Sequence, residues 1–474
     1  FVLIWSLIML YSSWQHIRYE YYLAANVALL GAVGLGGVLE WGYGPLHARI
    51  CASGPKENPD KPGKEPEKTA GKREKPGKSS EKQERKKAKG VHKDGDILPV
   101  AGVIAVLLLT LLFLYSSVSY SYAISSGKAI WANQDWKESL TWMGNNTPAT
   151  GVDYYKIYDM NTFQYPDSAY GVMSWWDYGH QITYIAQRIP NANPFQRNVA
   201  GPNGSAAYFL AESENTANTI LDNMGTRYVV TDIEMDTLPN GKFWAMATWY
   251  NGSAGVFPYL NIYSVSDPTN SGGSGNIAAI GENYYLTMIS RLHNFDGSMT
   301  TPTTLYYVEY TSGGLSSSSY PEIVQAKAMN YTTAAAAVKT FNANATSGAR
   351  ATLVSTSVAY PTIEVPALKH YRLVHESPTN VYDSTTLDVK YVKVFEYVKG
   401  AAIKGTGIIE VPVVTNTGRN FTYRQESENG MFVVPYATTG GSGEVKTTGK
   451  YHIIGTNQYF DVSEEAVDLG KTVN

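Results

Sequence analysis

The chain has 474 residues with 38 Lys+Arg and 41 Asp+Glu, a formal net charge of −3, and this balance argues against nucleic acid as a partner. The charge is segregated, because residues 53–96 hold 14 basic and 9 acidic residues and the remainder is net acidic. The single cysteine, Cys51, excludes an intramolecular disulfide framework.

The N-terminal part of the chain is predicted to lie in a membrane. Residues 97–115 form an uncharged run of 19 residues, close to the about 20 that a helix needs to cross a bilayer, so we expect a final transmembrane helix over 97–117. Residues 21–39 predict another span, with Ala and Gly suited to close helix contact. The chain opens with Phe1, inside an apolar run. We therefore expect residues 1–50 to be the last part of a multi-span region of a longer protein.

The segment 51–96 is rich in Lys, Glu, Pro and Gly and has almost nothing apolar to bury, so we expect a disordered loop. Its excess of Lys and Arg beside two spans predicts a cytoplasmic position. By alternation, residues 118–474 then lie on the extracellular face of a multi-pass membrane protein. Six Asn-x-Ser/Thr triplets all fall in that part, at Asn145, Asn203, Asn251, Asn330, Asn344 and Asn420.

The external part is predicted to be an α+β domain in two regions. In residues 118–299, helical and strand patterns alternate and favour a mixed α/β core, with an amphipathic helix over 182–189 and a strand over 226–232. Residues 300–474 are typical of β-sandwich or barrel-like modules, with one further helix over 323–342. The runs that predict strands there are 305–310, 390–398, 407–414 and 432–436.

The densest unusual cluster is Ser174-Trp175-Trp176-Asp177-Tyr178-Gly179-His180. Neighbouring residues on a helix point about 100° apart, so at least one of the two indoles is expected to face a cleft or solvent. One interpretation is structural: Ser174 and Asp177 have capping-box spacing, with both indoles packed underneath. The other is a recognition pocket, in which indole N–H donors and one carboxylate surround a small hydroxyl group.

This cluster, with YPDSAYGVM before it and QITYIAQRIPNANPFQ after it, resembles the signature of the catalytic subunit of oligosaccharyltransferase, the archaeal form in particular. The resemblance continues through DWKESLTWMGNNTP, through 232–249 and 290–297, and through VKVFEYVKGA. It implies many transmembrane helices followed by a soluble C-terminal domain on the outer face. It also implies transfer of a glycan from a lipid-linked (dolichyl) phosphate or pyrophosphate donor to the Asn of Asn-x-Ser/Thr.

The resemblance also implies roles for individual residues. Trp175, Trp176 and Asp177 match the family's pocket for the Ser/Thr hydroxyl at the +2 position of the acceptor. Such a site selects substrate by hydrogen bonding and strongly rejects residues that lack the hydroxyl. Asp177 is therefore not expected to act as a general base.

A second family element is an Asp…Lys…Met/Ile signature, matched here by Lys242 and Met246 at i, i+4 on one helix face. Met246 would contact the methyl group of a +2 Thr, and Lys242 would support the pocket. In the alternative interpretation, Met246 belongs with Phe243, Ala247 and Tyr250 on an ordinary core face. Either Asp236 or Asp232 could be the matching carboxylate.

Two further positions match family contacts to the donor phosphate. Arg18 resembles an arginine at an outer helix end, where a guanidinium fork suits phosphate oxygens; alternatively it is an interfacial arginine that reaches toward water. His180 stands where some relatives carry a tyrosine near the phosphate. It would donate to the leaving group or cap its neighbourhood.

The family's divalent metal, Mn²⁺ or Mg²⁺, is held by acidic residues of the N-terminal transmembrane half, and residues 1–50 show no ligand cluster to replace it. We therefore expect no metal site in this chain and no activity from it alone. The expected partners are a lipid-linked oligosaccharide, acceptor proteins and membrane lipid. The alternative function is a membrane-anchored surface protein with non-catalytic β modules.

Overall fold

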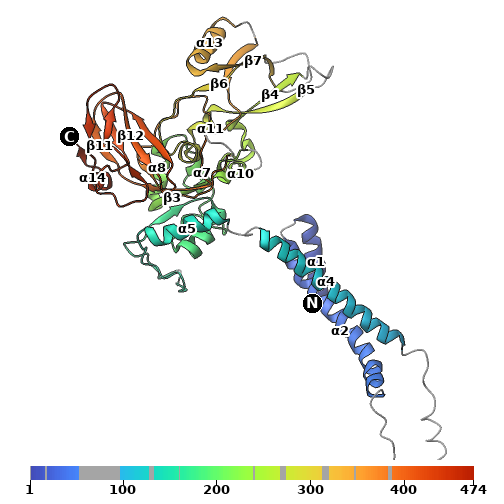
Figure 1. Ribbon diagram of the computed structural model, residues 1–474. Coiled ribbons are helices and arrows are strands. Elements are labelled where there is room, and N and C mark those ends of the chain that lie inside the picture. Colours follow the sequence, from blue (N-terminus) through green and yellow to red (C-terminus); the bar gives the residue numbers. More distant parts are fainter. Residues whose placement is uncertain are drawn as a thin grey trace, which may run out of the picture. The chain divides into compact units, whose positions relative to one another are not determined.

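The computed structural model forms two compact units, Phe1–Ile130 and Trp131–Asn474 (Figure 1). Arg18 and residues 53–96, the greater part of the loop expected to be disordered, lie outside the described residues. The structure describes residues 2–16, 19–52, 97–127, 133–159, 161–238, 241–266, 274–311, 320–345, 348–382 and 387–473.

The described residues of the first unit form the apolar helices α1 (Val2–Gln15), α2 (Glu20–Ala52) and α4 (Ile97–Gly127). Two of them are long and apolar enough to cross a membrane, over residues 21–44 of α2 and 100–123 of α4. Most of their large apolar side chains are exposed, as expected of surfaces that face lipid or further helices. The helices at the two predicted spans are confirmed, and α4 runs past the predicted end at residue 117.

The second unit is built on a mixed sheet of five strands in the order β2-β1-β3-β10-β9. Strands β2, β1 and β3 are parallel, whereas β10 and β9 are antiparallel to their neighbours. The predicted strand over 226–232 is confirmed as β3. The strands are β1 (Gly171–Met173), β2 (Ile189–Pro190), β3 (Thr226–Asp232), β9 (Tyr371–Glu376) and β10 (Val392–Tyr397).

Short helices surround this sheet, and several begin at a side-chain cap that satisfies a free backbone N–H. Asn133 caps the first of them by accepting from Trp136 N, and Asp232 caps another by accepting from Met235 N. The helices are α5 (Gln134–Asn146), η3 (Trp176–Tyr178), α6 (Gly179–Gln181), η4 (Ile182–Ala186), α7 (Ser205–Leu210), α8 (Glu214–Asn223), α9 (Ile233–Asp236), α10 (Lys242–Asn251), η5 (Gly252–Ala254), η6 (Phe257–Tyr259), α11 (Glu282–Leu286) and α12 (Met288–His293).

A second sheet, ordered β5-β4-β7-β6-β8, is covered by α13 (Tyr331–Asn344). The predicted helix over 323–342 is wrong in its first part, because residues up to Asn330 pair with β6 as a strand and Asn330 then caps the helix. The strands are β4 (Leu260–Ser266), β5 (Ser274–Ile280), β6 (Thr304–Thr311), β7 (Glu322–Asn330) and β8 (Ala349–Val354).

The C-terminal strands form two small sheets, β14-β11-β18 and β13-β12-β16-β17, with β15 paired to β12. Residues from both sheets and from α14 (Glu464–Leu469) share one apolar cluster. Whether this counts as a sandwich or barrel-like module stays a prediction. The strands are β11 (Ala401–Lys404), β12 (Ile408–Val414), β13 (Asn420–Glu426), β14 (Met431–Val434), β15 (Lys446–Thr447), β16 (Tyr451–Ile453), β17 (Tyr459–Phe460) and β18 (Thr472–Val473).

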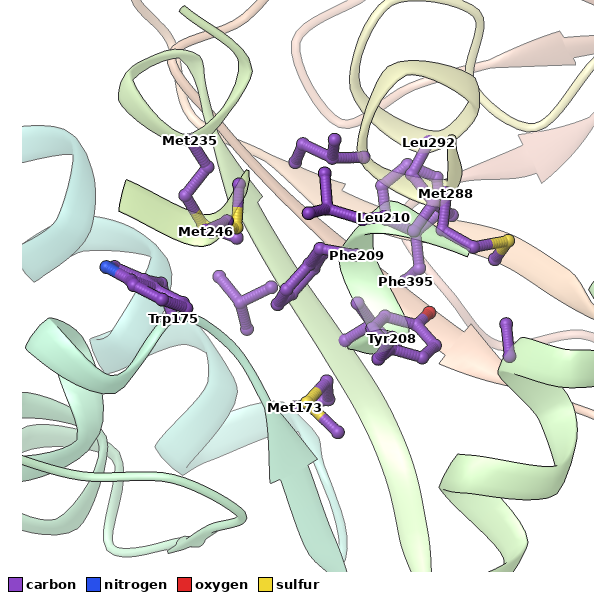
Figure 2. Packing of buried hydrophobic residues seen from close by; sticks show 14 of the residues in the cluster. Met173, Trp175, Tyr208, Phe209, Leu210, Met235, Met246, Met288, Leu292 and Phe395 are labelled. Atoms are coloured by element: carbon purple, nitrogen blue, oxygen red, sulfur yellow. The ribbon is translucent and has the colours of Figure 1, made fainter. Parts of the chain in front are cut away.

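The main core lies around the central sheet, where Figure 2 shows Phe209 and Phe395 packed between sulfur-containing side chains and Trp175. Strands β9 and β10 contribute to this core although they follow residue 300 in sequence. Strands β4 and β5 belong to the second sheet although they precede residue 300. Strands on both sides of the boundary predicted at 299/300 therefore share sheets, because strand pairing joins segments far apart in sequence.

Candidate functional site

Trp175, Trp176 and Asp177, called the Trp-Trp-Asp cluster below, follow shortly after β1, where the chain leaves the central sheet. Trp175 is still extended, with φ −66° and ψ 144°, and the single turns η3, α6 and η4 follow. The predicted helix over 182–189 is therefore wrong in length. Gln187, with φ 52°, stops the helical turn, because the chain reverses there to lay β2 parallel to β1. Ile182 and Ala186 are fully buried, as their predicted spacing requires.

Gly179 is needed where the turn approaches another segment. A Cβ atom at this position would lie 2.4 Å from Ala192 O and 2.5 Å from Asn193 Cα, which are backbone atoms that cannot move aside cheaply. We expect Gly179→Ala to lower the free energy of unfolding by about 1–3 kcal/mol. Gly275→Ala, where no atom lies within 4 Å, is the control. Equal denaturation midpoints for the two variants would contradict the prediction.

Tyr178 joins the cluster to two distant parts of the chain. Its ring stacks on Trp136 of α5, with centroids 3.8 Å apart, and its hydroxyl donates to Asp232 Oδ2 and accepts from Lys242 Nζ at 2.5 Å. Trp136 Nε1 donates to the same Asp232 Oδ2 at 2.7 Å. Burial and the Asp232 charge raise the pKa of Tyr178 well above its ordinary value, so the phenol keeps the proton that it donates.

Asp177 and Trp176 form the partly exposed edge of this arrangement. Asp177 Oδ2 lies 3.3 Å from Lys242 Nζ, and a third of the Asp177 side chain is exposed. Trp176 packs against the core, and its Nε1 is buried without a hydrogen-bond partner among the described residues. An unpaired donor therefore lies on the residue next to an accessible carboxylate acceptor that a lysine holds in place.

The predicted capping box at Ser174 and Asp177 does not form. The residue that precedes η3 is Trp175, with no side-chain cap, and Ser174 Oγ contacts Met235 Sδ at 3.9 Å instead. The chain is extended up to Trp175, so Ser174 lies on the strand side of the turn. Of the two indoles, Trp175 is 1% exposed and belongs to the core, as the structural interpretation expects.

Met246 has no exposed surface, and neither have Phe243 and Ala247 on the same helix. Figure 2 shows Met246, Met235 and Trp175 together at one end of the core. The core-face interpretation of this helix therefore describes its packing, except that Tyr250 is 47% exposed. In this state Met246 cannot touch a bound methyl group directly.

The structure separates the two candidate carboxylates of the second signature. Asp232 reaches Lys242 through Tyr178, whereas Asp236 accepts from Tyr284 OH at 2.5 Å and from Asn294 Nδ2 at 2.9 Å. Both carboxylates are fully buried. Burial raises the pKa of each, and that of Asp236 reaches about 7. Only Asp232 is part of the Lys242 network.

The raised pKa of Asp236 predicts a pH-dependent stability. The pKa of Asp236 is higher in the folded state than its unfolded value near 3.9. Its contribution to the free energy of unfolding is therefore complete below about pH 4 and is lost as pH rises through about 7. Asp236→Asn removes this loss, because Oδ1 of Asn294 is buried without a partner among the described residues and can accept from the new amide after a flip. We expect the variant's stability advantage over wild type to grow from pH 5 to pH 8 in urea melts. A constant difference would contradict this.

The two predicted donor contacts are placed differently. His180 is exposed, and its ring meets that of Phe195 edge to face at 5.2 Å. Its predicted roles, a contact to the donor phosphate or a cap, stay predictions. Arg18 lies outside the described residues, so its predicted role stays a prediction.

Two residues of this network, Trp136 and Tyr178, were not predicted as pocket residues, whereas Asp232 was one of the two candidate carboxylates. Tyr178 belongs to the cluster found in the sequence and could have been suspected from that position alone. Trp136 and Asp232 are 96 residues apart, and only the tertiary fold brings them together. The described residues contain no group of three or more His, Cys, Asp or Glu that could hold a metal ion.

Two family models match parts of this chain. Residues 133–236 match the AglB core domain, and residues 397–473 match the archaeal glycosylation protein B long peripheral domain. The AglB dolichyl-monophosphooligosaccharide–protein glycotransferase of Haloferax volcanii is 30% identical, over 93% of this chain and 43% of its own length. Dolichyl-phosphooligosaccharide–protein glycotransferase 3 of Archaeoglobus fulgidus is 31% identical, over 77% of this chain and 45% of its own length.

Two solved structures of Archaeoglobus fulgidus oligosaccharyltransferases share the fold. The apo form matches 99% of this chain and 52% of its own at a TM-score of 0.56 and 25% identity. The complex with an inhibitory peptide and a dolichol-phosphate matches 100% of this chain and 52% of its own at a TM-score of 0.58 and 23% identity. The chain covers 43% and 45% of the lengths of the Haloferax volcanii and Archaeoglobus fulgidus glycotransferases, less than half of each. Across most of its own length, it is a homologue of the archaeal AglB oligosaccharyltransferases.

Proposed function

We propose that the chain is the acceptor-recognition part of an oligosaccharyltransferase, which transfers a glycan from a lipid-linked (dolichyl) phosphate or pyrophosphate donor to the Asn of Asn-x-Ser/Thr. The observations that carry the proposal are the buried, unpaired N–H of Trp176 and the one-third-exposed carboxylate of the next residue in sequence, Asp177. A hydroxyl group both accepts and donates, so a Ser or Thr side chain would satisfy the two together.

Each residue has a part in the proposed pocket. The Trp176 indole donates to the acceptor hydroxyl, Asp177 accepts from it, and Lys242 holds the Asp177 carboxylate. Trp175 and Met246 form the packed floor beneath, since neither has appreciable exposed surface. The Tyr178 hydroxyl fixes Lys242 from the other side. This arrangement orients the acceptor and does not itself move a proton on the substrate amide.

The donor side of the reaction is proposed on resemblance. Arg18 would contact the donor phosphate, and the exposed ring of His180 is available to the same group. A divalent metal, Mn²⁺ or Mg²⁺, would be held elsewhere in the complete protein, because the described residues offer no set of three ligands and Asp177 is paired with Lys242. No step of the proposal runs through that metal. The globular unit would lie on the extracellular face of a multi-pass protein and meet acceptor proteins and lipid-linked donor there.

The test is peptide binding by the complete protein in membranes. An Asn-x-Thr peptide is expected to bind about tenfold more tightly than Asn-x-Val, which has the same shape without the hydroxyl. Trp176→Phe should remove this preference, whereas Trp244→Phe, at an indole 47% exposed on α10, should keep it. If wild-type protein binds both peptides equally, a non-catalytic membrane-anchored binding protein becomes the better account.

A further inference from the structure

A cavity of about 440 Å³ lies elsewhere in the globular unit. It is formed where β9, the edge strand of the central sheet, faces the segment 436–447 and the end of α5, and no residue of the Trp-Trp-Asp cluster lines it. The Tyr436 hydroxyl accepts from Leu373 N at 2.9 Å and joins the two sides. The volume is within the range of about 300–1,000 Å³ found for small-molecule sites.

One side of the cavity is a row of side chains from three adjacent strands. Tyr228, Glu396 and Arg372 stand opposite one another in the sheet register. Glu396 accepts from Arg227 Nε at 3.0 Å, from Arg372 Nη2 at 2.7 Å and from Tyr228 OH at 3.2 Å. Arg372 Nη2 also lies 2.7 Å from Glu464 Oε1, so two carboxylates balance the two guanidinium groups. An inorganic anion would have to compete with Glu396 for them.

The facing sides are rich in small polar groups. Residues 438–443 are Thr-Thr-Gly-Gly-Ser-Gly, and Gly440 has φ +79°, the left-handed region that glycine permits. Trp142 of α5 closes the cavity on the other side. Its ring is stacked on His375 with centroids 4.4 Å apart, and its Nε1 is buried without a partner among the described residues.

We propose that this cavity binds a neutral saccharide. Hydroxyl groups and glycine backbone lie on one side, and on another the charges of Arg227 and Arg372 are balanced by Glu396 and Glu464. With an indole that has an unpaired donor, this lining suits a ligand with many hydroxyls and no net charge. The inference deepens the proposed function and rests on it only for the source of the sugar. That source is either the glycan of the lipid-linked donor or a glycan already attached to an acceptor.

The experiment measures binding of the free oligosaccharide, released from the lipid-linked donor by mild acid, to the complete protein in detergent micelles by saturation-transfer NMR. Ser442→Trp fills the mouth of the cavity from an exposed loop position and is expected to weaken binding at least tenfold. Asn457→Trp, on an exposed turn that does not line the cavity, should leave binding unchanged. Trp142→Phe should weaken binding several-fold, because it removes the unpaired donor and keeps a ring against His375.

Three results would overturn the proposal. They are no binding of the oligosaccharide at millimolar concentration, an equal loss of binding in Ser442→Trp and Asn457→Trp, or binding of sulfate that displaces the sugar. Competition by intact lipid-linked donor or by a glycosylated peptide supports it and identifies the source. Preference for Asn-x-Thr peptide is measured on the same samples and should survive Ser442→Trp. If wild-type protein shows no such preference but still binds the oligosaccharide, the proposed function is refuted and the saccharide site is not.

Discussion

Asp296→Asn is expected to lower the free energy of unfolding of the globular unit by about 3–5 kcal/mol. Asp296 is 2.6 Å from Nζ of Lys393, which has no exposed surface, and binds both terminal nitrogens of Arg419. Arg419 is also paired with the buried Glu376. The four charges balance, so loss of one carboxylate leaves a buried cation without compensation. Asn is tolerated at the φ of +53° found here.

The matched control for this variant is Asp461→Asn, which breaks a contact of the same 2.6 Å length to Lys450 on the surface. Both partners are about half exposed there, so the expected loss is below about 1 kcal/mol. The two cations lower the pKa of Asp296 to about 2 against the opposing effect of burial. Its stabilisation is therefore present above about pH 4 and lost as pH falls toward 2. Similar urea midpoints for the two variants at pH 7 would show that the buried network contributes little.

Arg188→Met is expected to cost about 3 kcal/mol and to disturb acceptor selection, because Arg188 ties the Trp-Trp-Asp turn to α5. Its side chain is 5% exposed and meets no carboxylate among the described residues. It donates instead to Thr147 O at 2.7 Å, Ala186 O at 3.0 Å and Tyr170 OH at 2.8 Å. Removal of the guanidinium takes a donor from each of these buried acceptors, although the Tyr170 hydroxyl still donates to Pro148 O.

Arg197→Met is the control, since Arg197 is exposed and lies seven residues after the end of β2, the strand that follows the turn. It should change stability by less than about 0.5 kcal/mol. Arg188 acts through the turn, so Arg188→Met should also reduce the Asn-x-Thr over Asn-x-Val preference in protein that remains folded. Folded Arg188→Met protein with full preference would show that the guanidinium serves stability alone.

Local pattern predicted the strands well and the irregular segments poorly. Residues 226–232, 305–310, 390–398, 407–414 and 432–436 all contain the strands expected of them, because β-branched and aromatic alternation is a property of the segment itself. The run over 323–342 divides at Asn330 because pairing with β6 outweighs helical propensity. The helical turn after Tyr178 ends at Gln187 because the residues that follow pair with β1 as strand β2. That pairing cannot be predicted from a short stretch of sequence.

The same distinction applies to the candidate site. Trp175, Trp176 and Asp177 were predicted because they are adjacent and unusual in sequence. Lys242 was predicted from resemblance, and the structure does bring it to Asp177. Trp136 was missed because its role depends on a contact with Tyr178, 42 residues away. Asp232 was one of two candidate carboxylates, and only its contact with Tyr178 across 54 residues distinguishes it from Asp236.

The measurement that tests the account most directly is the kcat/KM for glycan transfer to Asn-x-Thr and Asn-x-Val peptides by the complete protein in membranes, for wild type and Asp177→Asn. A pocket that pairs with a hydroxyl should favour the Thr peptide by roughly 10⁴-fold in wild type, and Asp177→Asn should reduce this ratio by at least about tenfold, chiefly through slower transfer to the Thr peptide. Transfer with the same ratio in both proteins would contradict hydroxyl recognition by Trp176 and Asp177.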